Sequence, residues 1–438
     1  MIEEVATSPE GPSTAPRVSF WTLGCRLNQH DTAVMRARLV GEGGLREVRG
    51  ETGEADVIVV NTCTVTRRAD QEARQLVRKL HRDSPGARIV VTGCYAQRAP
   101  EELRGIPGVS AVLGTAEREA GEALLDAVGV HVGPSRSTRE FTSGEALHVG
   151  RSRALLKIQD GCDSFCTFCV VPYVRGKSRS LPAVEVLERA RRLLKAGFTE
   201  IVLTGADLGS YGRDLEETRA LPRLVEALLG LGAGHRIRLS SIEPNKVDPD
   251  LAAMIGTEPR LCRHLHLPLQ SASNPVLRAM RRGYTREAYA ALLDRVTGRG
   301  PVGIGADVMV GFPGEGDAEF AETRRFLEDA PIPFLHVFRY SPRPGTAAAR
   351  IGKPDDRARE RSEELRALGD AKARAFRRSL IGSTLPVVLE SGRGPLGPIA
   401  MSDLYVPVAL DRDPPSRRGI INVTIQNEEG QRLFGTTN

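Results

Sequence analysis

The sequence predicts an α/β protein with an N-terminal doubly wound parallel sheet, a central partial (β/α)6 barrel and a small C-terminal β-barrel. The first two parts are predicted because continuous β-branched runs alternate with helical stretches, and because this alternation occurs in two separate regions. The last part is predicted because helical periodicity disappears after about residue 380, where short strands are separated by Gly, Pro and Asp clusters. A chain of 438 residues is long enough for about two to four domains.

Composition excludes several classes of protein. Hydrophobic residues make up 40% of the chain, which suits ordinary globular cores, but no run of about eighteen apolar residues could cross a membrane. The start, Met1–Val5, is acidic and no apolar segment follows, so we expect no secretory signal and a cytoplasmic, reducing location. Seven cysteines fit metal ligation plus one leftover thiol better than a disulfide framework. The net charge of +6 is compatible with a polyanionic partner and does not by itself indicate one.

The N-terminal region begins with residues 1–16, whose Ser, Pro, Gly and Glu content predicts a disordered lead-in. Residues 17–130 are predicted to form the first folded domain. Its expected strands and helices are strands 18–23, 55–60, 88–92 and 109–113, and helices over about 31–40 and 68–82. Residues 131–147 are rich in Gly, Pro, Ser and Thr and are predicted to be a linker.

Three cysteines of this domain share one position in the pattern. Cys25, Cys63 and Cys94 each follow the carboxyl end of a predicted strand. In open α/β sheets those ends lie along one edge, where ligands bind. The alternative is three unrelated buried thiols, since free cysteine is among the most buried residue types. The repeated placement favours a metal site, a three-thiolate cluster with one open iron.

The central region, residues 148–378, repeats the alternation. The predicted strands are 154–159, 200–204, 236–241, 264–269, 303–310 and 334–340, and the predicted helices lie near 182–196, 221–231, 249–255, 275–298 and 318–329. Six such units fall short of the eight of a closed barrel, which predicts a partial barrel with its chemistry at the carboxyl face. A charged helix over 357–378 then leads to residues 379–438, the predicted small β-barrel, with strands at 385–389, 404–409, 420–425 and 431–434. Such barrels often bind oligonucleotides, although a capping role without a ligand is equally open.

A loop directly after the first of these strands carries Cys162, Cys166 and Cys169. Thiolates favour iron–sulfur clusters and zinc. A four-iron cluster wants four protein ligands, so three cysteines would leave one iron open for a substrate or cofactor. A zinc loop usually needs a second Cys or His pair at matching spacing, and none is near. The spacing therefore favours an open-corner [4Fe–4S] cluster.

With Phe168 before its last cysteine, this loop resembles the signature of radical S-adenosylmethionine enzymes. The flanking regions make the chain similar to the methylthiotransferase family, which has an N-terminal cluster domain, a radical barrel and a C-terminal TRAM domain. The stretches at 22–29 and 61–66 look most like the branch that acts on N6-threonylcarbamoyladenosine in tRNA. Further matching stretches are 264–271, 311–315 and 340–346. Ala272, Asp207 and the stretch 402–405 depart from the usual family residues.

The resemblance implies two [4Fe–4S] clusters. Cys162, Cys166 and Cys169 would hold the cluster that chelates S-adenosylmethionine, whose reductive cleavage gives a 5′-deoxyadenosyl radical. Cys25, Cys63 and Cys94 would hold the cluster that carries the sulfur to be inserted at C2 of the adenine, a position that no side-chain base could activate. One S-adenosylmethionine would methylate the sulfur and a second would supply the radical.

Other residues of the central region are assigned with the resemblance in view. We expect contacts to S-adenosylmethionine from residues at or just after barrel strand ends: Phe168, Gly205, Ser241 and Glu243. His264 and His266 share a strand face, lining the barrel or filling the core, and neither is interpreted as a ligand. Cys262 has no partner motif and is interpreted as structural.

The implied partners are the anticodon loop of tRNA, a reductant such as flavodoxin or ferredoxin, and a sulfur donor, with no membrane. An adenosine next to the anticodon can leave its stack at modest cost. Rival substrates within the family are N6-isopentenyladenosine in tRNA and an aspartate of a ribosomal protein. A hypothesis of another class is a non-catalytic iron–sulfur protein that binds RNA or transfers electrons.

Overall fold

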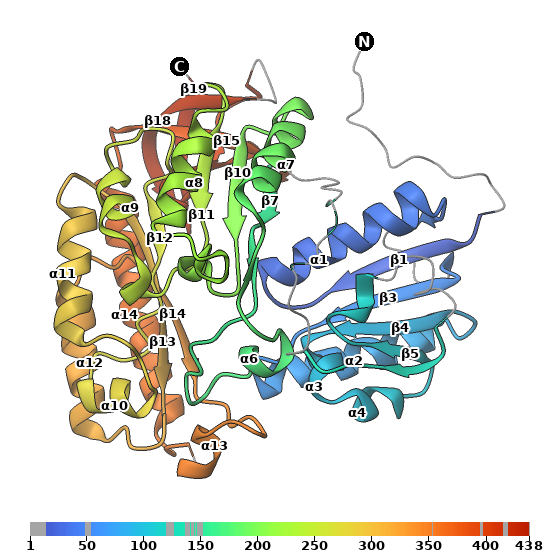
Figure 1. The fold of residues 1–438 in the computed structure, drawn as a ribbon. Helices are drawn as coiled ribbons and strands as arrows, with labels where there is room; N and C mark the ends of the chain where they lie inside the picture. Colours follow the sequence, from blue (N-terminus) through green and yellow to red (C-terminus); the bar gives the residue numbers. More distant parts are fainter. Residues whose placement is uncertain are drawn as a thin grey trace. The chain divides into compact units, whose positions relative to one another are not determined.

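The computed structural model describes residues 15–48, 54–119, 127–135, 141, 144, 146, 152–352, 354–394, 397–414 and 419–437. It divides the chain into two compact units, shown with their element labels in Figure 1. The first contains residues 1–149, 160–165 and 169–179, and the second contains residues 150–159, 166–168 and 180–438. Most of the predicted lead-in, 1–14, and much of the predicted linker lie outside the described residues. No helix in the described part is both long and apolar enough to cross a membrane.

The first unit is built on a parallel sheet. Its described strands run in the order β2-β1-β3-β4-β5-β6. Their bounds are β1 Arg17–Thr22, β2 Arg46–Glu47, β3 Val57–Thr62, β4 Arg88–Gly93, β5 Val109–Leu113 and β6 Gly129–His131. The associated helices are α1 Arg26–Arg36, a π-helical turn Ala37–Glu42, α2 Arg67–Asp83, α3 Cys94–Arg98 and α4 Pro100–Arg104. The parallel sheet agrees with the prediction, whereas α1 begins five residues before the predicted helix at about residue 31.

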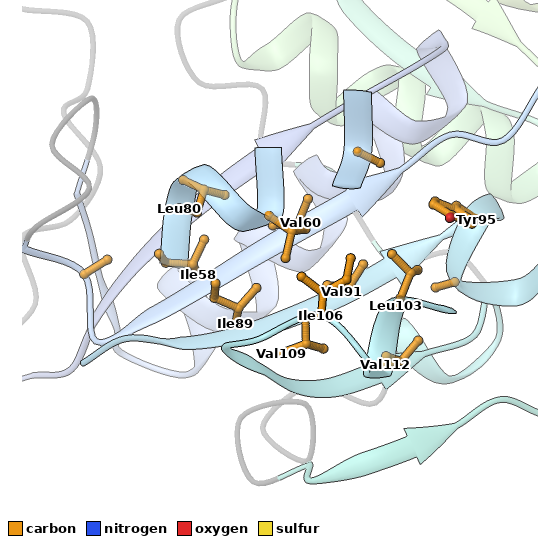
Figure 2. Close-up of a cluster of buried hydrophobic side chains, with 14 residues drawn as sticks. Ile58, Val60, Leu80, Ile89, Val91, Tyr95, Leu103, Ile106, Val109 and Val112 are labelled. Atoms are coloured by element: carbon orange, nitrogen blue, oxygen red, sulfur yellow. The ribbon is translucent and has the colours of Figure 1, made fainter. Parts of the chain in front are cut away.

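Both faces of this sheet are covered, because alternate residues of each strand point to opposite sides. On one face Ile58 and Val60 pack with Ala73, Val77 and Leu80, whose spacing places them on one side of α2. Figure 2 shows this core, which also contains residues of α3 and α4. On the other face Val57 and Val59 pack with residues of α1 and of the π-helical turn. Two-sided burial explains the continuous apolar runs in the strands.

The second unit contains the predicted partial barrel. Its described parallel strands form two three-stranded sheets, β7-β10-β11 and β12-β13-β14. Isolated bridges from Ile237 to Leu261 and from Ser241 to His266 join them at β11 and β12. The strands are β7 Ala154–Lys157, β10 Glu200–Thr204, β11 Arg236–Leu239, β12 His264–His266, β13 Gly303–Val310 and β14 Phe334–Arg339. The chain therefore alternates strands and helices around an open barrel, with strand carboxyl ends at one rim.

The longer helices of this unit follow the predicted pattern with one exception. They are α7 Ala183–Lys195, α8 Ala220–Leu229, α9 Pro249–Met254, α10 Asn274–Ala279, α11 Arg286–Thr297, α12 Asp317–Asp329 and α14 Ala358–Ser379. The predicted helix over 275–298 is wrong, because it is broken between α10 and α11. Arg281 adopts a left-handed conformation there, with φ 55°, and the Thr285 hydroxyl caps α11 by accepting a hydrogen bond from the Ala288 N–H.

The predicted C-terminal β-barrel is closed, with strand order β15-β16-β17-β19-β18. Its strands are β15 Thr384–Gly394, β16 Gly397–Ser402, β17 Pro407–Leu410, β18 Ile420–Glu429 and β19 Arg432–Thr437. The sequence did not predict β16, whose apolar and polar residues alternate only weakly. The barrel belongs to the same compact unit as β7 and β10–β14. Arg236 donates to the carbonyl oxygens of Pro386 and Met401, and Arg238 donates to those of Ser402 and Asp403.

A buried carboxylate on β10 lowers the cost of burying the guanidinium groups of Arg236 and Arg238. Glu200 is fully buried and accepts hydrogen bonds from Arg236 at 2.7 Å and Arg238 at 2.6 Å. Burial alone would raise the pKa of Glu200, but the two guanidinium groups overcome it and hold the pKa well below its usual range. The strand β11 thus carries two buried cations, and the single carboxylate on β10 offsets one of their two positive charges.

Replacing Glu200 by Ala should lower the free energy of unfolding by about 3–5 kcal/mol, because both arginines would stay buried without a carboxylate. Urea unfolding followed by circular dichroism measures the effect. Glu226→Ala is the matched control, since Glu226 is exposed on α8. Equal urea midpoints for the two variants would contradict the structural role given to Glu200.

Candidate functional site

Three predicted ligands, Cys25, Cys63 and Cys94, lie together in the first unit. Cys25 precedes α1, Cys63 directly follows β3, and Cys94 begins α3 directly after β4. Because β1, β3 and β4 are parallel neighbours, their carboxyl ends lie at one edge of the sheet. Cys25 is exposed, whereas Cys63 and Cys94 are buried, and all three are free thiols.

Glycines make the turns that present these thiols. Gly24 and Gly93 precede Cys25 and Cys94 with φ values of 99° and 97°, which L side chains rarely adopt. A Cβ at Gly24 would lie 2.6 Å from Cys63 Cβ and 3.0 Å from its Sγ. A Cβ at Gly93 would lie 2.4 Å from the carbonyl oxygen of Thr62. The turn bearing Cys25 therefore touches Cys63, and the turn bearing Cys94 touches the residue before Cys63.

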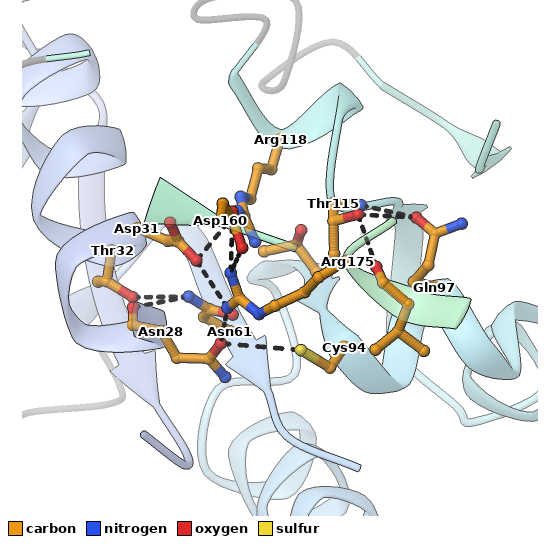
Figure 3. Close-up of polar contacts among 12 residues, drawn as sticks. Asn28, Asp31, Thr32, Asn61, Cys94, Gln97, Thr115, Arg118, Asp160 and Arg175 are labelled. Atoms are coloured by element: carbon orange, nitrogen blue, oxygen red, sulfur yellow. Dashed lines mark hydrogen bonds and ion pairs between the residues drawn. The ribbon is translucent and has the colours of Figure 1, made fainter. Parts of the chain in front are cut away.

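The side-chain amide of Asn28 connects the same turns. Asn28 is fully buried, and its Nδ2 donates to the carbonyl oxygens of Leu23 at 2.8 Å and Thr62 at 3.0 Å. Its Oδ1 accepts a hydrogen bond from Arg175 Nη2 at 2.7 Å and lies 4.0 Å from Cys94 Sγ (Figure 3). One side chain thus contacts the segments that carry all three thiols.

Electrostatics at this site oppose free thiolates in the metal-free protein. Burial, followed by the proximity of Cys94, raises the pKa of Cys63 to about 12. Burial also raises the pKa of Cys94, although the nearby Arg175 partly opposes this. A bound metal would favour the deprotonated form, and three clustered soft thiol donors fit an iron–sulfur cluster. Among the described residues no group of three His, Cys, Asp or Glu side chains already has the arrangement of a metal site.

The second set of predicted ligands is in the loop after β7. Cys162, Cys166 and Cys169 form no disulfide in the described part of the chain and are partly exposed. In the second unit, Arg282 Nη1 donates to Cys166 Sγ at 3.2 Å, and Arg282 Nη2 is ion-paired with Glu243. Burial raises the pKa of Glu243 and of the Cys166 thiol, and the Arg282 guanidinium opposes both shifts. Arg282 therefore links one predicted cluster ligand to one predicted cofactor contact.

The other predicted cofactor contacts lie around the same rim of the barrel strands. Phe168 packs against an apolar cluster that includes Met309, Phe312 and Tyr340. Gly205 directly follows β10, and a Cβ there would lie 2.8 Å from Gln159 Oε1, so this backbone approaches its neighbour closely. Ser241 follows β11, and its hydroxyl lies 2.7 Å from His266 Nδ1.

The three residues interpreted as non-ligands are also accounted for. His264 is buried against Tyr405, with ring centroids 4.6 Å apart. Cys262 is 2% exposed, and burial raises the pKa of its thiol to about 11. His266 is half-buried and contacts both Ser241 and Asp307, the latter at 3.4 Å. His266 therefore lies beside a predicted cofactor contact, which strand alternation alone did not indicate.

Sequence reasoning missed Arg282 and the Asn28–Arg175 contact. Arg282 was hidden because the stretch around it was predicted to be helical, whereas it lies in the break between α10 and α11. Asn28 lies in the stretch 22–29, which carries part of the family resemblance. The resemblance therefore drew attention to this stretch but assigned no role to Asn28. Arg175 gave no signal, since its partners Asn28 and Asp31 are more than 140 positions away in the chain.

A partial parallel barrel whose first strand leads into a C-x3-C-x2-C loop defines a radical S-adenosylmethionine enzyme. The radical SAM superfamily model matches residues 156–327, and the model described as uncharacterized protein family UPF0004 matches residues 17–114. Among solved structures, the radical S-adenosylmethionine methyltransferase TsrM from Kitasatospora setae has a similar fold. The TM-score is 0.56 over 87% of this chain and 80% of that chain, at 14% identity.

Comparison with curated proteins is more specific. The threonylcarbamoyladenosine tRNA methylthiotransferase MtaB of Bacillus subtilis is 39% identical over 85% of this chain and 84% of that protein. The same enzyme from Aquifex aeolicus is 37% identical, over 86% and 94%. The tRNA-2-methylthio-N(6)-dimethylallyladenosine synthase of Jannaschia sp. is 33% identical over 99% and 96%. The chain belongs to the radical S-adenosylmethionine methylthiotransferase family, and membership implies S-adenosylmethionine and a [4Fe–4S] cluster as cofactors.

In the metal-free, full-length protein, Cys63 should react with iodoacetamide about a thousandfold more slowly at about pH 8 than in urea. With a pKa of about 12, its thiolate fraction at that pH is on the order of 10⁻⁴, against roughly a quarter for an ordinary cysteine. The native rate should rise about tenfold per pH unit, because only the thiolate reacts. Peptide mass spectrometry measures the rates, and equal rates in native and urea-unfolded protein would contradict the predicted burial.

Proposed function

We propose that this enzyme inserts a methylthio group at C2 of N6-threonylcarbamoyladenosine-37, next to the anticodon of tRNA. It would use two [4Fe–4S] clusters and two S-adenosylmethionine molecules per turnover. The observation that carries the proposal is the presence of two separate three-cysteine sets in one chain, each following parallel strands at their carboxyl ends. One set serves radical chemistry, and the other is available to carry the sulfur.

In the N-terminal unit, Cys25, Cys63 and Cys94 would hold the sulfur-carrying cluster. Three protein ligands leave one of four irons open, which is where a sulfur atom can be bound. Asn28 keeps the three turns in contact through its amide, as described above. The two glycines allow the thiols to project from tight turns without side-chain clashes.

In the barrel, Cys162, Cys166 and Cys169 would hold the cluster that binds S-adenosylmethionine. That cluster, when bound, supplies the electron for reductive cleavage of the sulfonium. Phe168, Gly205, Ser241 and Glu243 would contact S-adenosylmethionine. Arg282 would act as a positioning residue, because it donates to Cys166 and pairs with Glu243. A Cβ at Gly205 would lie 2.8 Å from Gln159 Oε1, so this residue would contact S-adenosylmethionine through its backbone.

The chemistry explains why such a site is needed. The C2–H bond of adenine is not acidic, so a side-chain base would not remove its hydrogen. The adenine would have to leave its stack, which an anticodon-loop nucleotide does at modest cost. The closed C-terminal barrel has the size of small barrels that bind oligonucleotides, and would bind the tRNA. A reductant such as flavodoxin or ferredoxin and a sulfur donor complete the reaction, in the cytoplasm.

Threonylcarbamoyladenosine is favoured over the rival substrates by the relatives. Two relatives named for it are 39% and 37% identical, against 36% for the dimethylallyladenosine synthase from Trichlorobacter lovleyi. Methylthiolation of N6-isopentenyladenosine is the second candidate, because a relative named for that kind of substrate is also similar. No relative reported above supports methylthiolation of an aspartate of a ribosomal protein, and none supports a non-catalytic iron–sulfur protein.

The experiment is nucleoside mass spectrometry after anaerobic reaction of the reconstituted enzyme with two matched tRNAs. One carries threonylcarbamoyladenosine at position 37 and the other carries isopentenyladenosine. The 2-methylthio product should form on the first at least about a hundredfold faster, which is within the range by which enzymes discriminate substrates that differ in their polar groups. A Cys63→Ser variant is the control and should give no methylthio product on either tRNA. Faster modification of the isopentenyladenosine tRNA would refute the proposed substrate.

A further inference from the structure

A row of four polar side chains crosses neighbouring strands of the partial barrel, entirely within the second unit. Ser241 follows β11, and His266, Asp307 and His336 lie on β12, β13 and β14. Ser241 Oγ lies 2.7 Å from His266 Nδ1. Asp307 Oδ1 lies 3.4 Å from His266 Nε2 and 3.5 Å from His336 Nδ1. The row therefore begins at an expected contact of S-adenosylmethionine and ends on the last strand of the barrel.

His336 lies on the inner face of β14. The neighbouring Leu335 faces α14, because a Cβ added at Gly369 of that helix would lie 3.1 Å from Leu335 Cβ. Adjacent residues of a strand point to opposite faces, so His336 points away from α14 and into the barrel. Asp307 is the residue directly opposite His336 on β13, and the two side chains meet on this inner face.

The same face of β14 reaches the expected cofactor position. Phe338, two residues after His336, points the same way and packs against the apolar cluster that Phe168 also contacts. Phe168 and Ser241 are both expected contacts of S-adenosylmethionine. A ligand group at His336 would therefore lie beside the cofactor and inside the barrel.

His336 has one ring nitrogen that the folded chain does not use. Its side chain is 87% exposed, and within the described part of the chain only Nδ1 has a partner, Asp307. Hydrogen bonding to Asp307 raises the pKa of His336. Burial alone would raise the pKa of Asp307, but the two imidazoles overcome it and hold that pKa well below its usual range. Asp307 thus favours the imidazolium form of His336, in which Nε2 is a second donor.

This donor is directed rather than part of a general anion site. Asp307 offsets the positive charge of His336, so the pair offers one N–H and little net charge. The threonylcarbamoyl group has a carboxylate, a carbonyl oxygen and a hydroxyl that can accept a hydrogen bond. The isopentenyl group of the rival substrate has neither nitrogen nor oxygen. An unused donor inside the barrel therefore fits the first group and gains nothing from the second.

We propose that His336 is a specificity-determining residue whose Nε2 donates a hydrogen bond to the carboxylate of the threonylcarbamoyl group. Hydrogen bonds between charged partners are the strongest of the available choices. Asp307 is the positioning residue, because it holds the imidazole through Nδ1 and leaves Nε2 for the substrate. This inference rests on the proposed function, since it takes threonylcarbamoyladenosine as the substrate.

The test measures binding of two tRNAs of one sequence, with and without the threonylcarbamoyl group on adenosine-37. The full-length, anaerobically reconstituted protein is titrated in the presence of S-adenosylmethionine, and fluorescence anisotropy gives each Kd. The wild type should bind the threonylcarbamoylated tRNA at least about tenfold more tightly, which is the effect of one hydrogen bond to a charged group. His336→Phe keeps a ring and loses the donor, so its two Kd values should agree within about twofold. Retention of the tenfold preference by His336→Phe would overturn the proposal.

Two controls separate this contact from other roles of His336. His131→Phe is the matched variant, since His131 is exposed on β6 of the first unit, and it should keep the tenfold preference. Formation of 5′-deoxyadenosine without RNA should stay within about twofold of the wild type in His336→Phe. A several-fold loss would mean that His336 serves S-adenosylmethionine, and equal weakening of both tRNAs would mean that it contacts another part of the RNA. Either result would overturn the proposal.

The binding test is independent of product formation. Absence of the methylthio product on threonylcarbamoyladenosine with the wild type would refute the proposed function, whatever the binding ratio. Formation of that product by the wild type, with an unchanged binding preference in His336→Phe, would refute the role of His336 alone.

Discussion

The buried side-chain amide of Asn28 is the interaction on which the N-terminal site depends. Parallel strands bring three turns to one edge of the sheet, but they do not fix the distances between those turns. Asn28 does so by donating to Leu23 and Thr62 and by contacting Cys94. Its backbone carbonyl in turn accepts a hydrogen bond from Asn61, at 2.9 Å. A cluster ligand set drawn from three distant parts of the sequence needs such a fixed frame.

Buried charged residues connect Asn28 to the chain just before Cys162. Asp160, which lies two residues before Cys162, accepts two hydrogen bonds from Arg175, at 3.0 and 3.1 Å. Arg175 also bonds to Asn28 and Asp31, so four buried polar side chains share one network within the first unit. Such networks are costly when any member is missing. This favours one defined geometry for the three cysteine turns and for residues 160–165 and 169–179 of the same unit.

The sequence was most informative where a pattern repeats. Alternating apolar strands and helices predicted the parallel sheet and the open barrel, and strand-end positions predicted that Cys25, Cys63 and Cys94 would meet. It was least informative for contacts between distant segments, because the pairing of Arg175 with Asn28 leaves no local trace. The break around Arg282 had a local signal that the prediction of one helix passed over, because Gly283 is a poor helix former and Thr285 is a good helix cap.

The central claim is that two cysteine sets hold two separate clusters with one open iron each. Iron analysis with Mössbauer spectroscopy on the anaerobically reconstituted, full-length protein tests it most directly. The wild type should bind about eight irons per chain, all in [4Fe–4S] signals, and Cys63→Ala should retain about four. A wild-type protein that binds only about four irons would contradict the two-cluster account.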